Sequence, residues 1–398
     1  MVDPATGILL VIALSASFFA AWTIGAGSSG STPFAPAVGA NAVSTMRAAL
    51  VVGVLAFAGA VLQGAAITET MGEGLIAEVS LSPLAATIAL IIASLYIAAG
   101  VFAGYPIATS FAITGSIIGV GLGMGGAPAW DTYTELGLYW LLTPFAIFPP
   151  VYVLTQLLRG EQLSNRVLIP LLAGSVGAVV ANMEFLLLGS GGEPASLADN
   201  VIGVAPVSPL FTRLVVTLLL ATVVALVVRR DMRQDVVGAQ RRFLIALGAL
   251  MAFTAGGGKV GLAVGPLLPL LDGIWGSVSI TPVLLFGAFG MLIGTWMAAP
   301  RMIKALTQDY AMLGPRRSIA IFIPSFVVAQ VGIFLGLPMA FNQIFIAAIA
   351  ATGYAVGSKA VSERKLVVTA LVWVGSMIFG LAVGYGGYLI VHLATGMT

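Results

Sequence analysis

Two glycine-rich stretches carry the polar residues best suited to bind an anion. The chain reads AWTIGAGSSG over residues 21–30 and AFTAGGGKVG over residues 252–261, an offset of 231. Equivalent glycines are Gly25, Gly27 and Gly30 in the first copy and Gly256, Gly258 and Gly261 in the second. Hydroxyl side chains follow in the first copy, at Ser28, Ser29, Ser31 and Thr32, and Lys259 takes the place of Ser28 in the second. If a helix begins after Gly30 and another after Gly261, their unpaired N–H groups and positive dipole ends form a binding site for an oxyanion.

A second pair of stretches repeats at nearly the same offset. GYPIATSFAITG begins at residue 104 and GLPMAFNQIFIA at residue 336, an offset of 232. Each contains a Gly-X-Pro, with Pro106 and Pro338, and proline interrupts a helix because it lacks an N–H and its ring clashes with the preceding turn. Small polar residues follow each proline: Thr109 and Ser110 in the first stretch, Asn342 and Gln343 in the second. We expect these side chains to complete the same anion site.

The composition shows which solvent surrounds these turns. Hydrophobic residues make up 59% of the 398 residues and charged residues 8%, and the mean hydropathy is +1.08. Such a chain has too little charge to cover a particle in water, and its apolar runs of about 20 residues match the ~30 Å hydrocarbon core. Helices are expected because every backbone polar group must be satisfied within lipid. The sequence therefore predicts an all-α polytopic membrane protein that lies in the lipid bilayer.

About twelve transmembrane spans can be placed along the sequence. They lie at roughly 5–24, 47–67, 84–103, 106–124, 136–158, 167–190, 202–228, 242–255, 281–299, 318–335, 338–357 and 366–390, with broken continuations to residues 43 and 270. Arginines collect in the loops that contain 159–166 and 229–242, which favours the cytoplasm for both loops. Glu193 and Asp199 lie in a loop expected outside. With twelve spans, both termini are predicted to lie outside.

The charged loops also predict an inverted-topology repeat. An acidic loop with Glu69, Glu73 and Glu78 is matched, 231 residues later, by a basic region with Arg301 and Lys304. Two further loop pairs reverse sign in the same way, which is expected if one half lies upside down relative to the other. We divide the chain into a first inverted repeat (1–135), linking spans with a cytoplasmic loop (136–240) and a second inverted repeat (241–398).

Lys259 is the leading functional candidate because an ionisable group in the apolar core is costly to bury. The alternative is a lysine that extends to the aqueous edge or caps a helix end. Glu184, in ANMEFLLLG between the two repeats, is interpreted as an interface or packing residue rather than a coupling carboxylate. His392 is the sole histidine, which is too few for a metal site.

Signatures of catalysis are missing from the sequence. It contains no Walker A motif, no H-E-x-x-H and no cysteine, which excludes thiolate metal sites and disulfides. The net charge of +2 gives no indication of nucleic-acid binding. We therefore expect no enzyme activity, no cofactor and no metal.

These motifs resemble those of the inorganic phosphate transporters, the Pit family of phosphate permeases. GAGSSGSTPFAPAVG (25–39) and GGGKVGLAVGP (256–266) stand where that family carries G-A-N-D-V-A-N, and PIATSF (106–111) and PMAFNQ (338–343) stand at its P-V-S-T-T-H segment. The resemblance covers both repeats, about three quarters of the chain. It implies a secondary transporter of inorganic phosphate that works by alternating access, commonly as a homodimer. A prokaryotic plasma membrane is the expected location.

Departures from the family pattern bear on coupling and substrate. Gly27-Ser28 and Gly258-Lys259 replace the family's Asn-Asp pairs, whose aspartates are associated with cation binding. A proton is therefore expected as the coupling ion rather than sodium, with Lys259 in place of the missing cation. A site with a lysine and no carboxylate also suits sulfate, which is the alternative substrate. An anion channel or a non-transporting receptor is the alternative of another class.

Overall fold

The computed structural model describes the chain at residues 4–30, 32–103, 107–160, 164–189, 193–202, 208–276, 278–309, 313–357 and 363–396. The first half contains α1 (Pro4–Ile24), a π-helical turn η1 (Gly25–Ser29), a 3₁₀ turn η2 (Thr32–Phe34), α2 (Ala35–Gly39), α3 (Thr45–Gln63), α4 (Ala65–Glu73), β1 (Ile76–Ala77), α5 (Pro83–Ala103), α6 (Thr109–Gly123), β2 (Ala127–Pro128) and α7 (Trp130–Arg159). The middle contains α8 (Asn165–Ala181), β3 (Glu184–Phe185), a 3₁₀ turn η3 (Leu186–Leu188), β4 (Ala195–Ser196), α9 (Leu197–Ile202) and α10 (Pro209–Gln234). The last part contains α11 (Val236–Val264), a 3₁₀ turn η4 (Gly265–Leu267), α12 (Leu268–Trp275), α13 (Ile280–Asp309), α14 (Pro315–Phe334), α15 (Phe341–Val356) and α16 (Glu363–Thr395).

Membrane-spanning helices dominate the structure, which confirms the predicted all-α polytopic class. In the described part of the chain, nine helical segments are long and apolar enough to cross a bilayer. Three further apolar helices, α6, α8 and α15, have 15 to 17 residues. At 1.5 Å per residue they are about 22–26 Å long, short of the ~30 Å hydrocarbon core. Each of the twelve predicted spans overlaps one of these twelve segments, but twelve membrane crossings stay a prediction, because only nine of the described segments have the length of a span.

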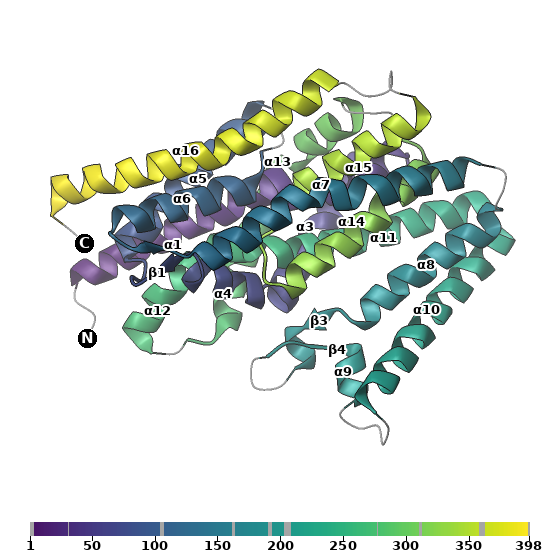
Figure 1. Ribbon diagram of the computed structural model, residues 1–398, viewed down its shortest axis with the longest axis horizontal. Coiled ribbons are helices and arrows are strands. Elements are labelled where there is room, and N and C mark those ends of the chain that lie inside the picture. The colour runs from purple at the N-terminus through teal and green to yellow at the C-terminus, as the bar shows by residue number, and fades with distance from the viewer. Residues whose placement is uncertain are drawn as a thin grey trace.

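The helices form one elongated bundle with a peripheral pair (Figure 1). The long helix α16 lies along one edge, where it packs against α6. Helices α8 and α10 pack against each other on the opposite side of the bundle, with β3, β4 and α9 at one end of the pair. The start of α1 and the end of α16 lie at the same end of the molecule in this view.

Two short antiparallel ladders join the loops between helices. In the first, β1 pairs with β2, so that the segment before α5 lies beside the segment after α6. In the second, β3 pairs with β4 between α8 and α10. Two residues per strand are too few to form a sheet with its own core, so the role of each ladder is to join the loops that connect the helices.

Elements of the first half recur in the last part of the chain. Helix α5 begins at residue 83 and α14 at 315, and α6 begins at 109 and α15 at 341, so both offsets are 232. The packing recurs as well, because α1 contacts α13 and α5, while α11 contacts α3 and α14. The opposite orientation of the two halves stays a prediction.

Glycines allow the two central helix crossings to be unusually close. A Cβ on Gly25 would overlap the backbone carbonyl of Met291 in α13, and one on Gly256 would overlap that of Ala56 in α3. Small residues of this kind let membrane helices approach through their backbones. The repeated glycines of the sequence therefore serve the packing of the central helices.

Candidate functional site

The first glycine-rich stretch is irregular, as predicted, but the second is not. Helix α1 ends at Ile24, and the chain continues through the π turn η1, where the Gly30 N–H donates to the Gly25 carbonyl at 3.0 Å. In contrast, α11 runs unbroken from Val236 to Val264 and includes Gly256, Gly258 and Gly261. The expectation that a helix begins after Gly261 was therefore wrong.

Tertiary packing explains why these glycines do not break α11. Each glycine costs about 1 kcal/mol relative to alanine in a helix, a local preference that packing readily overrides. Gly256 packs against the backbone of α3. A Cβ on Gly261 would lie 2.5 Å from the backbone nitrogen of Thr68 in α4. The second interruption lies further along, at the 3₁₀ turn η4 that contains Pro266.

The first stretch also departs from the expected helix start after Gly30. The chain enters the 3₁₀ turn η2 before α2 begins at Ala35, and α2 has only five residues. Such a short helix has little dipole to offer an anion. Of the predicted residues there, Ser31 lies outside the described residues.

Two helix starts meet in the interior, one from each half of the chain. Helix α6 begins at Thr109, and α15 begins at Phe341 after the loop that contains Pro338. The Asn342 amide donates to the Ile107 carbonyl at 2.7 Å, which joins the start of α15 to the residues before α6. The Ser110 hydroxyl donates to the Met339 carbonyl at 2.5 Å in the reverse direction. Pro106 lies outside the described residues, so its predicted helix break is not described.

Lys259 reaches this junction from α11. Its ammonium donates hydrogen bonds to the hydroxyl oxygens of Thr109 and Ser110, the latter at 3.3 Å. It also lies 5.9 Å from the centroid of the Phe341 ring, within the range of a cation–π interaction. The side chain is fully buried, and no carboxylate of the described residues lies within ion-pair distance of it.

Thr32 connects the first glycine-rich stretch to the same place. Its hydroxyl donates to the Asn342 side-chain oxygen at 2.5 Å, across 310 residues of sequence. We use the name Lys259 site for five residues, each with an exposed fraction of 1% or less: Thr32, Thr109, Ser110, Lys259 and Asn342. The sequence predicted all five.

Other predicted residues lie elsewhere. The Ser29 hydroxyl donates to the Ile24 carbonyl at 3.2 Å, within its own turn. The Gln343 amide donates to the Trp140 carbonyl at 2.9 Å, and Gln343 thereby ties α15 to α7. Ser28 is buried in η1. Among the described residues, neither Ser29 nor Gln343 forms a hydrogen bond with the Lys259 ammonium.

Sequence reasoning missed two aromatic residues that shape this region. The Trp140 indole N–H donates to the Pro338 carbonyl at 2.9 Å and its ring lies 4.3 Å from that of Phe111, so it holds the loop before α15. Phe341 lies beside the Lys259 ammonium. No sequence pattern marked either one, because an aromatic residue in an apolar helix reads as ordinary packing.

The Lys259 site has the chemistry of an anion receptor. The first N–H groups of α6 and α15 have no partner within their own helices and carry the positive dipole ends. An ammonium and three hydroxyl groups stand beside these N–H groups. Within the described ranges, no cluster of three or more histidine, cysteine, aspartate or glutamate side chains could hold a metal ion. Backbone N–H groups, hydroxyl groups and an ammonium are the donors with which proteins bind oxyanions.

Comparisons with known proteins identify the family of the chain. The model of the phosphate transporter family matches residues 24–384. The Pyrococcus furiosus protein named "Putative phosphate permease PF1020" is 26% identical over 387 residues, 89% of each chain. The Arabidopsis thaliana protein named "Inorganic phosphate transporter 2-1, chloroplastic" is 25% identical and is matched over 92% of this chain and 70% of its own length.

A solved structure has the same fold. The structure titled "The sodium-dependent phosphate transporter" superposes with a TM-score of 0.76 at 22% identity, over 97% of this chain and 99% of its own. At this identity the likeness concerns the fold. The family match spans most of the chain, and the protein described here therefore belongs to the phosphate transporter family.

Proposed function

We propose that this protein carries inorganic phosphate across the membrane by alternating access, and that the anion binds at the Lys259 site. The observation that carries the proposal is the burial of Lys259, whose hydrogen-bond partners among the described residues, Thr109 and Ser110, are both neutral. An unpaired ammonium in a low-dielectric interior costs several kcal/mol, which an arriving anion offsets. Two helix starts beside the ammonium supply N–H donors for the remaining anion oxygens.

The halves of the chain would act as the two moving parts. Inverted repeats in transporters place the substrate at their interface, and rocking of one repeat against the other exposes the site to each side. The recurrence of α5 and α6 as α14 and α15 supports this division into 1–135, 136–240 and 241–398. The start of α1 and the end of α16 lie at one end of the molecule, which supports termini on the same side, and we place that side outside a prokaryotic plasma membrane. A homodimer is part of the same proposal.

Coupling to protons rather than sodium ions follows from the charge at the site. Lys259 already supplies the positive charge that a bound sodium ion would bring beside the anion. The solved relative is sodium-dependent by its title, yet its 22% identity leaves room for a different coupling ion. We therefore expect transport in solutions without sodium.

Sulfate is the second candidate substrate. Phosphate carries a proton at neutral pH, and this proton is best received by an acceptor such as a carboxylate. The hydrogen bonds and ion pairs of the Lys259 site include no carboxylate from the described residues. This feature favours an anion that only accepts hydrogen bonds. An anion channel or receptor is the alternative of another class.

Uptake of labelled phosphate into proteoliposomes tests the proposal. Vesicles are loaded so that a proton gradient or a sodium gradient is present alone, and unlabelled sulfate is added as a competitor. We expect accumulation driven by the proton gradient, abolished by a protonophore and unaffected by sulfate. Competition by sulfate would indicate that the site binds sulfate, the alternative substrate. Uptake that depends on sodium would contradict coupling to protons. Flux without accumulation would indicate a channel.

A further inference from the structure

A cavity separate from the Lys259 site opens between the peripheral helix pair and α14. Its volume is about 510 Å³, and α8, β3, α9, α10 and α14 contribute to its walls. The lining residues that matter for its chemistry are Asn182, Glu184, Asp199, Arg213, Val331 and Phe334. The proposed transport mechanism uses none of them.

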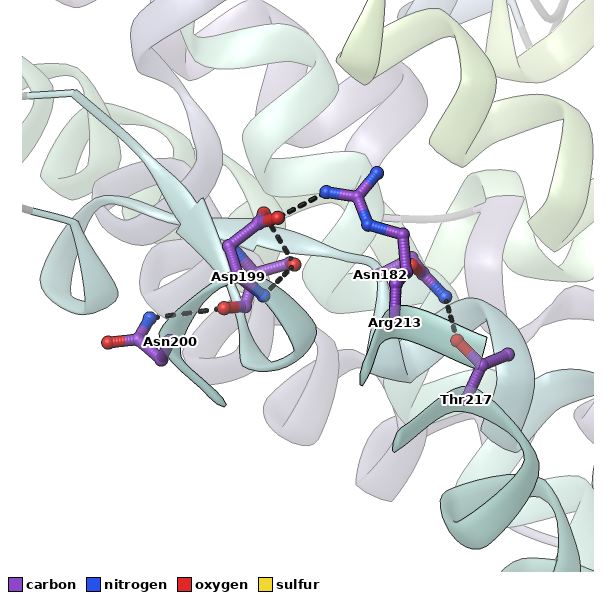
Figure 2. Close-up of polar contacts among 6 residues, drawn as sticks. Asn182, Asp199, Asn200, Arg213 and Thr217 are labelled. Atoms are coloured by element: carbon purple, nitrogen blue, oxygen red, sulfur yellow. Dashed lines mark hydrogen bonds and ion pairs between the residues drawn. The ribbon is translucent and has the colours of Figure 1, made fainter. Parts of the chain in front are cut away.

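One end of the cavity is polar and charged (Figure 2). Arg213 forms an ion pair with Asp199, whose carboxylate also accepts a hydrogen bond from the Ser196 hydroxyl at 2.6 Å. Beside this pair, the Asn182 amide donates to the Thr217 hydroxyl at 2.9 Å. These contacts tie the end of α8 to the start of α10, and they fix the charges in place.

The wall contributed by α14 is apolar. Val327, Val331 and Phe334 lie on one face of α14 at a spacing of four and three residues, and their exposed fractions are 39%, 48% and 65%. Val179 of α8 lies on the other side of the cavity. These exposed side chains give the cavity an apolar wall along α14.

The polar residues of the cavity lie close to helix ends. Asn182 directly follows the last residue of α8, and Arg213 is in the first two turns of α10. Val327 lies seven residues before Phe334, about 10 Å further along α14 at 1.5 Å per residue. This gradient from charge to hydrocarbon matches that of a membrane lipid, whose headgroup lies at the interface and whose chains extend inward.

The charge of the cavity specifies the headgroup. It is lined by two carboxylates, Glu184 and Asp199, and by one guanidinium, that of Arg213. Asp199 is paired, whereas no hydrogen bond to the Glu184 carboxylate is found among the described residues. Burial raises the pKa of Glu184, the negative charge of Asp199 raises it further, and Arg213 acts in the opposite direction. A cation beside Glu184 would relieve both effects.

We propose that this cavity binds one phospholipid whose headgroup carries a primary ammonium and a phosphate, as phosphatidylethanolamine does. The ammonium donates hydrogen bonds to Glu184, the phosphate lies by Arg213 and Asn182, and an acyl chain covers Val327, Val331 and Phe334. A primary ammonium fits better than a quaternary one, because only the former has N–H groups to donate to a carboxylate. The bound lipid would connect the α8–α10 pair to α14.

Native mass spectrometry of the full-length protein in detergent tests this proposal with three lipids. Phosphatidylethanolamine is compared with phosphatidylcholine, which has no N–H donor, and with phosphatidylglycerol, which has no ammonium. One charge-assisted hydrogen bond to Glu184 predicts about tenfold tighter binding of phosphatidylethanolamine. Glu184→Gln should remove this preference, whereas Glu135→Gln, at an exposed carboxylate outside the cavity, should retain it.

A second variant tests the apolar wall of the cavity independently of the Glu184 charge. Val331→Trp fills the apolar wall and should weaken the bound lipid while Glu184 remains in place. Equal binding of all three lipids by the wild type would overturn the proposal, as would strongest binding of phosphatidylglycerol. So would an unchanged preference in Glu184→Gln or undiminished binding in Val331→Trp. Each outcome is independent of whether phosphate is the transported anion.

Discussion

Replacing Lys259 by methionine tests two effects of the lysine charge: its contribution to phosphate binding and its destabilisation of the empty folded protein. Methionine fills a similar volume with an unbranched apolar chain, so the surrounding helices keep their contacts. The side chain is fully buried, and in the described part of the chain its hydrogen-bond partners are Thr109 and Ser110. We predict that Lys259→Met weakens phosphate binding severely while the empty protein unfolds at the same or a higher temperature.

The expected loss of affinity follows from the electrostatics of the site. An ammonium and an oxyanion 4 Å apart attract each other by about 4 kcal/mol at an effective dielectric constant of 20. Desolvation offsets part of this attraction, and hydrogen bonds to charged groups contribute about 1.5–3 kcal/mol in mutational series. At 1.4 kcal/mol per factor of ten, phosphate affinity should fall by roughly 10- to 100-fold.

The effect on folding should have the opposite sign. The buried charge destabilises the empty protein, since replacing unpaired buried charges by apolar residues of similar volume is often neutral or stabilising. A ligand that binds only the folded state at 100 times its Kd adds about 2.7 kcal/mol to the free energy of unfolding. Phosphate should therefore raise the melting temperature of the wild type but not that of Lys259→Met.

The assay is thermal unfolding of purified protein with and without phosphate, paired with uptake in proteoliposomes. Lys304→Gln is the matched control, because Lys304 is an exposed cation near the end of α13. It should keep both the phosphate-induced shift and transport. A Lys259→Met protein that still binds and transports phosphate at wild-type levels would refute the reasoning, and so would an empty variant that unfolds several degrees lower.

Three further predictions concern the stability of the fold. Asn342→Leu removes both side-chain hydrogen bonds of Asn342 and leaves two buried groups, the Thr32 hydroxyl and the Ile107 carbonyl, without these partners. The free energy of unfolding, measured in detergent solution, should therefore fall by about 2–4 kcal/mol. Gly25→Ala should destabilise the protein because its Cβ would overlap the Met291 carbonyl, whereas Gly137→Ala, with open space around it, should be neutral in the same assay. Burial raises the pKa of Asp199, but hydrogen bonds and the ion pair outweigh burial and lower the pKa below its ordinary value. Its contribution to stability should thus be complete above pH ~4 and fade as the pH falls through the lowered pKa, where melting temperatures of wild type and Asp199→Asn should converge.

Much of the fold could be predicted because apolar length and proline position are local properties. The spans expected at 84–103 and 338–357 correspond closely to α5 at Pro83–Ala103 and α15 at Phe341–Val356. The constant offset between the two halves was also visible, since it depends on glycines and prolines that mark turns and close contacts. Helix length was harder to judge, because α6, α8 and α15 are shorter than a complete span.

The failures lie where distant packing decides the outcome. The glycines of 256–261 suggested a break, but contacts with α3 and α4 keep α11 continuous there. Gln343 follows Asn342 directly, yet successive positions on a helix point in different directions, and Gln343 contacts α7 instead of the anion site. Trp140 lies 198 residues before its partner Pro338, so no local pattern could connect them.

Counterflow of labelled phosphate tests the central claim most directly. Proteoliposomes are loaded with a high concentration of unlabelled phosphate and diluted into a trace of labelled phosphate, with no other ion gradient. A carrier with one alternately exposed site predicts a transient accumulation of label inside that exceeds the outside concentration, and loading with sulfate should abolish it. Label that merely equilibrates would contradict alternating access, and an overshoot in sulfate-loaded vesicles would contradict phosphate as the specific substrate.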